Sequence, residues 1–398
     1  MTPDVAIVGG GIVGLATALA LVERHAKSVV VLEAERAVGE QQTGHNSGVI
    51  HSGLYYTPRS LKATLSRTGL ELMYRFCEEE EVPHRQCGKL VLAVSDLERA
   101  RLDRLEQIGR ANGVAIRRVE GSALTDFEPN VVGVAGLWVE DTGVVDFGAV
   151  ARAMQRRLER QGGQVRVDSR VNAIRREGNG FAIETASGMV SSRTVITCAG
   201  LYADRVARMA GVEPLVRIVP FRGEYYRLRD ERAHLVRGLI YPVPDPALPF
   251  LGVHLTRGAD DVVEAGPNAV LATKREGYRW GDVSARDMAD WLGFPGFWRM
   301  GMRHWRTGLR EIARSLSVDR FTRSLQRLVP SIQRQDLLPA GAGVRAHALA
   351  RDGTLIADFL FHEQPGALHV LNAPSPAATA SLAIGRTIAA RMFPLSMI

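Results

Sequence analysis

Residues 5–33 read VAIVGGGIVGLATALALVERHAKSVVVLE, and this stretch decides the fold. The short apolar runs Asp4–Val8 and Val29–Leu32 predict two buried strands, and Ile12–His25 between them predicts a helix. The turn after the first strand carries the pattern G-x-G-x-x-G at residues 9–14. A strand–helix–strand unit with a glycine-rich first turn is typical of Rossmann-like α/β domains that bind a dinucleotide.

Each glycine of this turn has a physical purpose. Gly9 permits the tight turn, Gly11 lets the backbone approach a pyrophosphate, and Gly14 lets the helix pack closely on the strand. The free N–H groups at the helix start, at Ile12 and Val13, favour phosphate binding. The turn therefore predicts a pyrophosphate site.

Glu33 ends the second strand, about 20 residues after the glycines, where an acid accepts hydrogen bonds from ribose hydroxyls. An acid at this place disfavours a 2′-phosphate on the ribose. The glycine pattern and Glu33 together do not distinguish FAD from NAD.

Composition bounds the class of protein. The chain has 398 residues, of which 46% are hydrophobic and 23% charged, and this predicts two or three globular domains. Only Cys77, Cys87 and Cys198 are present, without a close pair, so we expect no disulfide framework, no zinc site and a reducing, cytoplasmic location. The net charge of +7 allows nucleic acid, membranes or acidic small molecules as partners, and no nucleic-acid motif is found.

The apolar run Val5–Val22 is almost long enough to suggest a membrane span. Its glycines would break a simple helix, and no basic segment precedes it as in a signal peptide. We therefore interpret it as a buried strand, a turn and a buried helix of a soluble protein.

Residues 43–56 read TGHNSGVIHSGLYY, a loop dense in small hydrogen-bond donors that can run along a cofactor towards its reactive end. This loop resembles the signature loop of the L-2-hydroxyglutarate dehydrogenases and oxidases, flavoproteins related to D-amino-acid oxidase and glycerol-3-phosphate dehydrogenase. Segments that resemble the same family occur along essentially the whole chain, at residues 250–257 (FLGVHLTR), 264–269 (EAGPNA), 274–278 (KREGY), 343–346 (GVRA) and 372–379 (NAPSPAAT).

The resemblance implies a two-domain flavoprotein of the α/β class. The Rossmann-like FAD-binding domain would be discontinuous, with residues 1–82, 140–215 and 335–398, and a mixed-sheet substrate domain would hold residues 83–139 and 216–334. It also implies oxidation of L-2-hydroxyglutarate to 2-oxoglutarate by hydride transfer to flavin N5, with electrons passed to a quinone or to oxygen.

The family pattern also implies which residues hold FAD. The glycine turn would contact the pyrophosphate and Glu33 the ribose, and a helix N-terminus near residue 377 would stabilise the negative charge of reduced flavin. The full set of cofactor residues is Gly9, Gly11, Ile12, Val13, Gly14, Glu33, Thr43, Asn46, Ser47, Val171, Ala199, Gly200, Arg345, Ala377 and Ala378.

Oxidation of a 2-hydroxy acid needs a base for the hydroxyl proton, and histidine suits that role. We favour His51, because its loop should line the flavin, with His254 as the alternative base or a substrate hydrogen-bond donor.

The substrate is a dianion, and arginine binds carboxylates well through its planar fork. Arg257 and Arg345 lie in segments that resemble the family. Lys274 and Arg275 are further cationic candidates, and Tyr241 and Thr256 could add hydroxyl donors.

Two alternatives remain open. The same flavoprotein could act on another 2-hydroxy acid, an amino acid or glycerol 3-phosphate, or the chain could be a basic protein that binds nucleic acid or membrane. A basic helical region, residues 298–327, carries a row of apolar residues at helical spacing accompanied by arginines. It either packs on the substrate domain or lies on a membrane, which would place the protein peripherally on the inner face of the cell membrane. The oligomeric state is not predicted.

Overall fold

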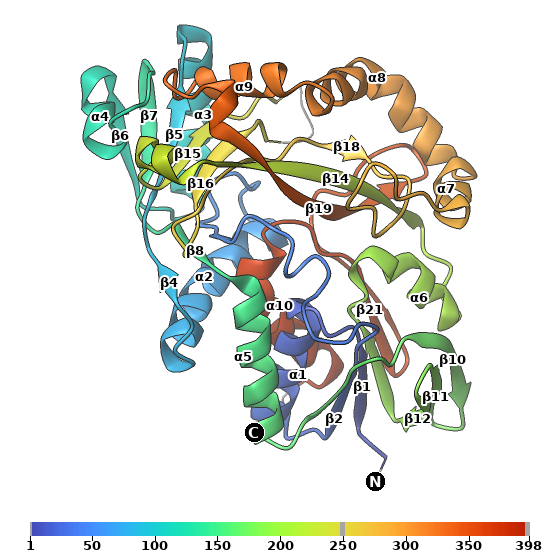
Figure 1. Cartoon of the computed structure of the whole chain (residues 1–398). Helices are drawn as coiled ribbons and strands as arrows, with labels where there is room; N and C mark the ends of the chain where they lie inside the picture. The colour runs from blue at the N-terminus through green and yellow to red at the C-terminus, as the bar shows by residue number, and fades with distance from the viewer. Residues whose placement is uncertain (1, 247–250, 395–398) are drawn as a thin grey trace.

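The computed structural model describes residues 2–246 and 251–394, so Phe250 of the family-like segment 250–257 lies outside them. Two sheets stand one above the other in Figure 1, the smaller below and the larger above. The predicted opening is confirmed, because β1 (Val5–Val8), α1 (Ile12–His25) and β2 (Val29–Leu32) follow one another as expected.

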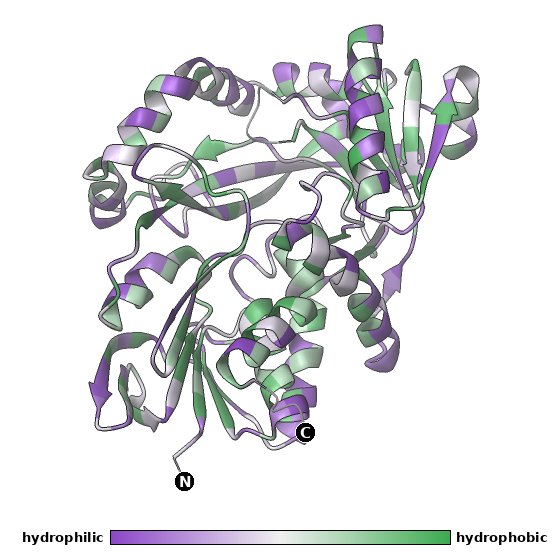
Figure 2. Cartoon of the chain, turned by 180° about the vertical axis from the view of Figure 1, so that it is seen from behind, coloured by the Kyte–Doolittle hydropathy of each residue, from purple (hydrophilic) through white to green (hydrophobic). Residues whose placement is uncertain are grey.

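The lower, six-stranded sheet has five parallel strands and one antiparallel edge strand. Its order is β20 (Leu360–Gln364), β21 (Ala367–Asn372), β13 (Thr194–Thr197), β1, β2 and β9 (Gln164–Arg166). Because β1 and β2 are buried on both faces, their residues are apolar throughout, and Figure 2 shows the central strands as hydrophobic.

Helices cover one face of this sheet. The helix α1 packs against α10 (Ala377–Met392) and α5 (Phe147–Arg160), and α10 packs against α2 (Leu61–Glu79). A Cβ atom on Gly385 would lie 2.4 Å from the carbonyl oxygen of Ala16, so the absence of a side chain there lets α10 approach α1 closely. The other face contacts α6 (Ala203–Met209) and the three-stranded sheet β10 (Val171–Glu177), β11 (Gly180–Thr185) and β12 (Gly188–Ser192).

The upper, nine-stranded sheet is mixed, because β15 and β5 are parallel while its other pairs are antiparallel. Its order is β18 (Val270–Leu271), β14 (Val216–Leu228), β17 (Val263–Gly266), β16 (His254–Arg257), β15 (Leu239–Pro242), β5 (Lys89–Ala93), β7 (Ala135–Val139) and β6 (Ile116–Glu120), with β19 (Leu337–Ala350) paired to β14. Around it lie α3 (Asp96–Ala111), α4 (Leu124–Phe127), α7 (Ala285–Leu292), α8 (Pro295–Ser315) and α9 (Val318–Gln326).

The sheet topology corrects one predicted boundary. Residues 335–398 were assigned to the FAD domain, but β19 pairs with β14 along almost its whole length, from Val216 opposite Ala350 to Leu228 opposite Leu337. The strand β19 therefore belongs to the upper sheet, and the lower sheet resumes only with β20. The glycine, alanine and proline content of β19 hides a strand pattern, and its partner lies about 120 residues earlier in the sequence.

The chain crosses from one sheet to the other four times, and the four crossing segments run beside one another in two pairs. On one side β14 lies beside β19, and on the other β4 (His84–Arg85) lies antiparallel to β8 (Gly143–Val145), which also pairs with β3 (Val49–Ile50). Among the described residues, no helix has the length and apolarity needed to cross a membrane.

Candidate active site

A cavity of about 780 Å³ is lined by residues of both sheets. One end lies at the turn between β1 and α1, and other parts of its wall come from His51, from Tyr241 on β15 and from His254 on β16. Its size and its mixture of apolar and polar walls are typical of small-molecule sites.

At the nucleotide end, the glycines form an open cradle. A Cβ on Gly9, whose φ is +109°, would meet the carbonyl oxygen of Cys198 at 2.4 Å, and one on Gly14 would meet the carbonyl oxygen of Gly9 at 2.0 Å. A Cβ on Gly11 would lie 3.4 Å from the Thr43 hydroxyl, which is an ordinary contact, and Gly11 lines the cavity. Gly9 and Gly14 thus shape the turn, while Gly11 leaves its backbone open to a ligand.

Glu33 is buried at the cavity wall and held by two backbone groups. Its Oε2 accepts a hydrogen bond from Gly10 N at 2.6 Å, and its Oε1 accepts one from Glu35 N at 2.9 Å. Burial raises the pKa of Glu33, while these hydrogen bonds lower it. The carboxylate is therefore fixed where it can accept hydroxyl donors.

The loop after β2 is tied to the start of α1 and to α10. The Thr43 hydroxyl accepts a hydrogen bond from Ile12 N at 3.1 Å. His51 N donates to the Thr379 hydroxyl at 3.0 Å, in the first turn of α10. The positive end of the α10 dipole therefore lies beside the His51 loop, and Ala377 and Ala378 of that turn line the cavity.

These features fit an extended adenine dinucleotide such as FAD. The open cradle at Gly11 suits a pyrophosphate, Glu33 suits the ribose, and the α10 N-terminus suits a ring that gains negative charge on reduction. The predicted cofactor residues Val171, Ala199 and Gly200 line the same cavity, as do Val13, Asn46 and Ser47.

At the other end, the half-buried His51 and the buried His254 are held neutral. Burial lowers the pKa of His51 to about 3, with nearby Lys89 and His254 acting in the same direction. Burial also lowers the pKa of His254 to about 3, although its hydrogen bond to Gly252 raises it. Neutral imidazoles can accept a proton.

Their surroundings orient them differently. His254 Nδ1 lies 3.0 Å from the Gly252 carbonyl oxygen, so the neutral ring donates there and keeps Nε2 as an acceptor, and its ring stacks on Tyr241 at 3.9 Å. Within residues 2–246 and 251–394, neither His51 Nδ1 nor the Tyr55 hydroxyl has a hydrogen-bond partner. Buried polar atoms without partners are costly and are common where a ligand binds.

Cationic side chains surround this end of the cavity. Arg345 on β19 lines it and donates to the Asn268 carbonyl oxygen at 3.2 Å; burial lowers its pKa. Lys62 on α2 also lines the cavity, and burial lowers its pKa to about 8. Lys62 was absent from the predicted site.

Lys89 was also missed and is the most deeply buried lysine here. It is 1% exposed, and its Nζ lies 4.6 Å from the ring centre of Tyr55 and 5.2 Å from that of Tyr241, both of which line the cavity. Burial lowers its pKa to about 7. A lysine at the start of the apolar strand KLVLA was the sequence signal that could have revealed it.

The structure corrects the prediction for Arg257. Its guanidinium donates to the carbonyl oxygens of Val236 at 3.0 Å and Ala233 at 2.7 Å and lies 3.5 Å from Asp261, away from the cavity lining. Thr256 and Lys274 are likewise not among the lining residues. These three predicted substrate residues are therefore not brought to the cavity.

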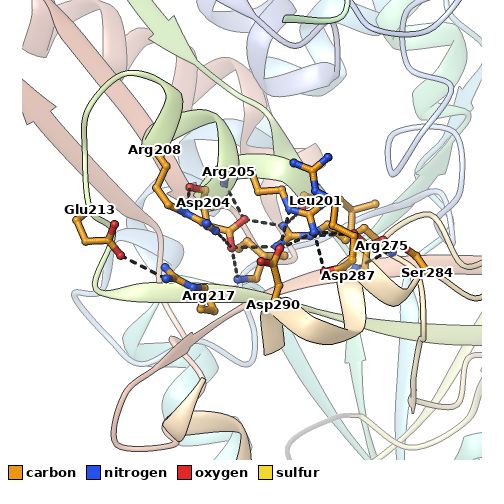
Figure 3. A network of polar contacts seen from close by, with 12 residues as sticks. Leu201, Asp204, Arg205, Arg208, Glu213, Arg217, Arg275, Ser284, Asp287 and Asp290 are labelled. Carbon is orange, nitrogen blue, oxygen red and sulfur yellow. Dashed lines mark hydrogen bonds and ion pairs between the residues drawn. The ribbon is translucent and has the colours of Figure 1, made fainter. Parts of the chain in front are cut away.

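Arg275, a further predicted candidate, belongs to an ion-pair network (Figure 3). It is 1% exposed, and its Nη2 lies 3.0 Å from Asp204 of α6 and 3.3 Å from Asp290 of α7. Arg205 of α6 also pairs with Asp287, at 2.7 Å. The network fastens α6 of the lower domain to α7 of the upper one, which explains why Arg275 is unavailable to a ligand.

A family model described as FAD dependent oxidoreductase matches residues 4–391. The chain belongs to this family. The L-2-hydroxyglutarate dehydrogenase of Indibacter alkaliphilus is 48% identical over 388 residues, covering 97% of each chain. That of Escherichia coli strain K12 is 44% identical over 98% of this chain and 93% of its own, and the mitochondrial enzyme of Homo sapiens is 43% identical over 97% and 88%. The predicted family resemblance and the FAD cofactor are thereby confirmed.

Solved structures share the fold. The L-α-glycerophosphate oxidase of Mycoplasma pneumoniae, with FAD bound, superposes with a TM-score of 0.80 at 23% identity, covering 98% of this chain and 95% of its own. Glycine oxidase from Geobacillus kaustophilus superposes with a TM-score of 0.75 at 18% identity, covering 98% and 94%. The predicted α/β flavoprotein fold is therefore confirmed.

Proposed function

We propose that this flavoprotein oxidises L-2-hydroxyglutarate to 2-oxoglutarate. The observation that carries the proposal is the joining, in one cavity, of an open dinucleotide cradle with the neutral His51 and His254 and the cationic Arg345. Relatives that match nearly the whole chain are named L-2-hydroxyglutarate dehydrogenase, which supports this substrate.

In the proposed reaction, the residues that line the cavity bind the substrate carboxylates and accept the hydroxyl proton. Arg345 binds one carboxylate of the substrate through its guanidinium, and Lys62 supplies a second cation on the cavity wall. His51 accepts the proton of the C2 hydroxyl, and His254 with Tyr241 positions the substrate. Bound FAD supplies the hydride acceptor for C2. Lys89 beneath Tyr55 and Tyr241 adds positive potential that attracts a dianion.

Anaerobic reduction of the bound flavin tests the proposal. The FAD-loaded protein is mixed with L-2-hydroxyglutarate and, as a control, with the D isomer, and flavin absorbance is followed with product analysis. We expect bleaching and 2-oxoglutarate with the L isomer only. Absence of bleaching with the L isomer would refute the assignment.

A second candidate keeps the flavin and changes the substrate to another 2-hydroxy acid, an amino acid or glycerol 3-phosphate. The fold shared with glycerophosphate oxidase and glycine oxidase favours including these compounds in the assay. A site for a dicarboxylate should be inhibited competitively by succinate or glutarate, whereas a site for glycine or glycerol 3-phosphate should not.

We further propose that the electrons pass to a quinone or to oxygen, and that the protein works in the cytoplasm in peripheral contact with the inner face of the cell membrane. The three free cysteines support a reducing compartment. Reoxidation of the reduced enzyme with oxygen and with a soluble quinone identifies the acceptor.

A further inference from the structure

The helix α8 carries a row of hydrophobic side chains that are largely exposed. Trp298, Met302 and Trp305 are 57%, 72% and 56% exposed, and the row continues with Leu309, Ile312 and Leu316. At about 100° per residue these six positions fall within an arc of roughly 80°. The exposure excludes the interpretation that this row packs on the substrate domain.

The opposite face of α8 holds the helix on the upper sheet. Gly296 and Met300 are buried, and a Cβ on Gly296 would lie 2.1 Å from the carbonyl oxygen of Ala350. Glu311 accepts a hydrogen bond from Ala269 N at 3.3 Å. Figure 1 shows α8 along the outer edge of the molecule, which agrees with the exposure of the hydrophobic row.

A cationic flank runs beside the row. It consists of Arg299, Arg303, Arg306 and Arg310, all exposed. In the described part of the chain, none of the four forms an ion pair with a carboxylate. The one acidic residue of α8, Glu311, is paired with Arg314 at 2.6 Å. The free charge along this surface is therefore positive.

We propose that α8 docks this protein on the surface of an anionic lipid bilayer. The hydrophobic row would enter the boundary between headgroups and acyl chains, where tryptophan is favoured, and the cationic flank would bind lipid phosphates. A second copy of the chain fits less well, because a symmetric contact through this face would bring two sets of unpaired arginines together. This inference rests on the peripheral membrane contact proposed above and names the surface that makes it. The surface is separate from the proposed reaction, since no residue of the row or flank lines the cavity.

Co-sedimentation of the FAD-loaded protein with vesicles tests this surface without substrate. The vesicles contain phosphatidylcholine alone or mixed with phosphatidylglycerol. We expect wild type to sediment with the mixed vesicles at low salt and to be released as salt rises. Replacing Arg306 and Arg310 by glutamine should weaken binding about 30-fold, roughly fivefold for each charge. The double variant Trp298→Ser/Trp305→Ser should lose binding even at low salt.

The matched control is Leu97→Ser/Leu215→Ser, which removes two exposed leucines from other surfaces and should bind like wild type. An unchanged flavin spectrum and turnover with a soluble dye show that each variant is folded. Equal binding to both vesicle types, no binding by wild type, or a dimer that only the α8 variants convert to monomer in light scattering would each overturn the proposal.

Discussion

Replacing Lys89 by methionine should make the protein more stable and less active. Lys89 is buried, and its pKa is lowered from 10.5 to about 7 by burial. At about 1.4 kcal/mol per pKa unit, the fold disfavours the charged lysine by at most about 5 kcal/mol. Methionine has a similar length and no charge, so Lys89→Met removes this cost while losing the positive potential beneath the cavity wall.

The pH dependence separates this effect from packing. Because the pKa of Lys89 is lower in the folded than in the unfolded state, the unfolded chain binds more protons between about pH 7 and 10.5. Wild-type stability should therefore rise with pH in this window, by about 1.4 kcal/mol per unit from this residue. The free energy of unfolding of Lys89→Met should exceed that of wild type most at pH 6, and the difference should be about 3 kcal/mol smaller at pH 9.

Urea unfolding followed by tryptophan fluorescence at both pH values measures the difference, because the packing change contributes equally at each pH. The half-buried Lys274, outside the cavity, provides the control Lys274→Met. If the stability difference between Lys89→Met and wild type is the same at pH 6 and pH 9, Lys89 is not a buried unpaired cation. If Lys89→Met reduces its flavin with substrate as fast as wild type does, the proposal that Lys89 helps to bind the dianionic substrate is wrong.

His51→Ala should keep FAD but slow anaerobic flavin reduction by about 10²–10⁴-fold, as expected for loss of a general base. Because the pKa of His51 is about 3, the wild-type rate should not fall between pH 8 and 5 through its protonation, and a loss of rate near pH 6 would contradict this. Arg345→Met should raise KM for the substrate about 10- to 100-fold, whereas Arg257→Met should leave it nearly unchanged; equal effects in steady-state kinetics would contradict the placement of the two. Arg275→Met should destabilise the protein by about 3–5 kcal/mol in urea unfolding, because the buried Asp204 would lose its closest cationic partner and keep only Arg208, at 3.4 Å, and a near-neutral result would refute that account.

The nucleotide half of the site was predictable because its residues are contiguous. Strand, glycine turn, helix and Glu33 all lie within residues 5–33, and each local pattern agrees with the others. The glycines have the close packing and the open backbone that the pattern predicts, and Gly14 does not line the cavity; their contact with the cofactor stays a prediction.

The residues at the reactive end of the cavity were harder to predict, because their position depends on the face of the strand to which each side chain points. His254 and Arg257 are three residues apart on β16, so they point to opposite faces, and only His254 reaches the cavity. Spacing alone could have excluded Arg257. The fate of Arg275 could not be foreseen, because its partners come from α6 and α7, elements that the sequence does not bring together.

The paired passages between the two sheets bear on how a substrate enters. β14 is hydrogen-bonded to β19, and β4 to β8, so the four connections form two ribbons instead of four single tethers. A hinge motion that separated the two sheets would have to break or bend both pairs of hydrogen-bonded strands. The ion pair between Asp204 and Arg275 would also oppose this motion. We therefore expect the two halves to move as one body during turnover, with admission of substrate governed by small side-chain rearrangements at the mouth of the cavity.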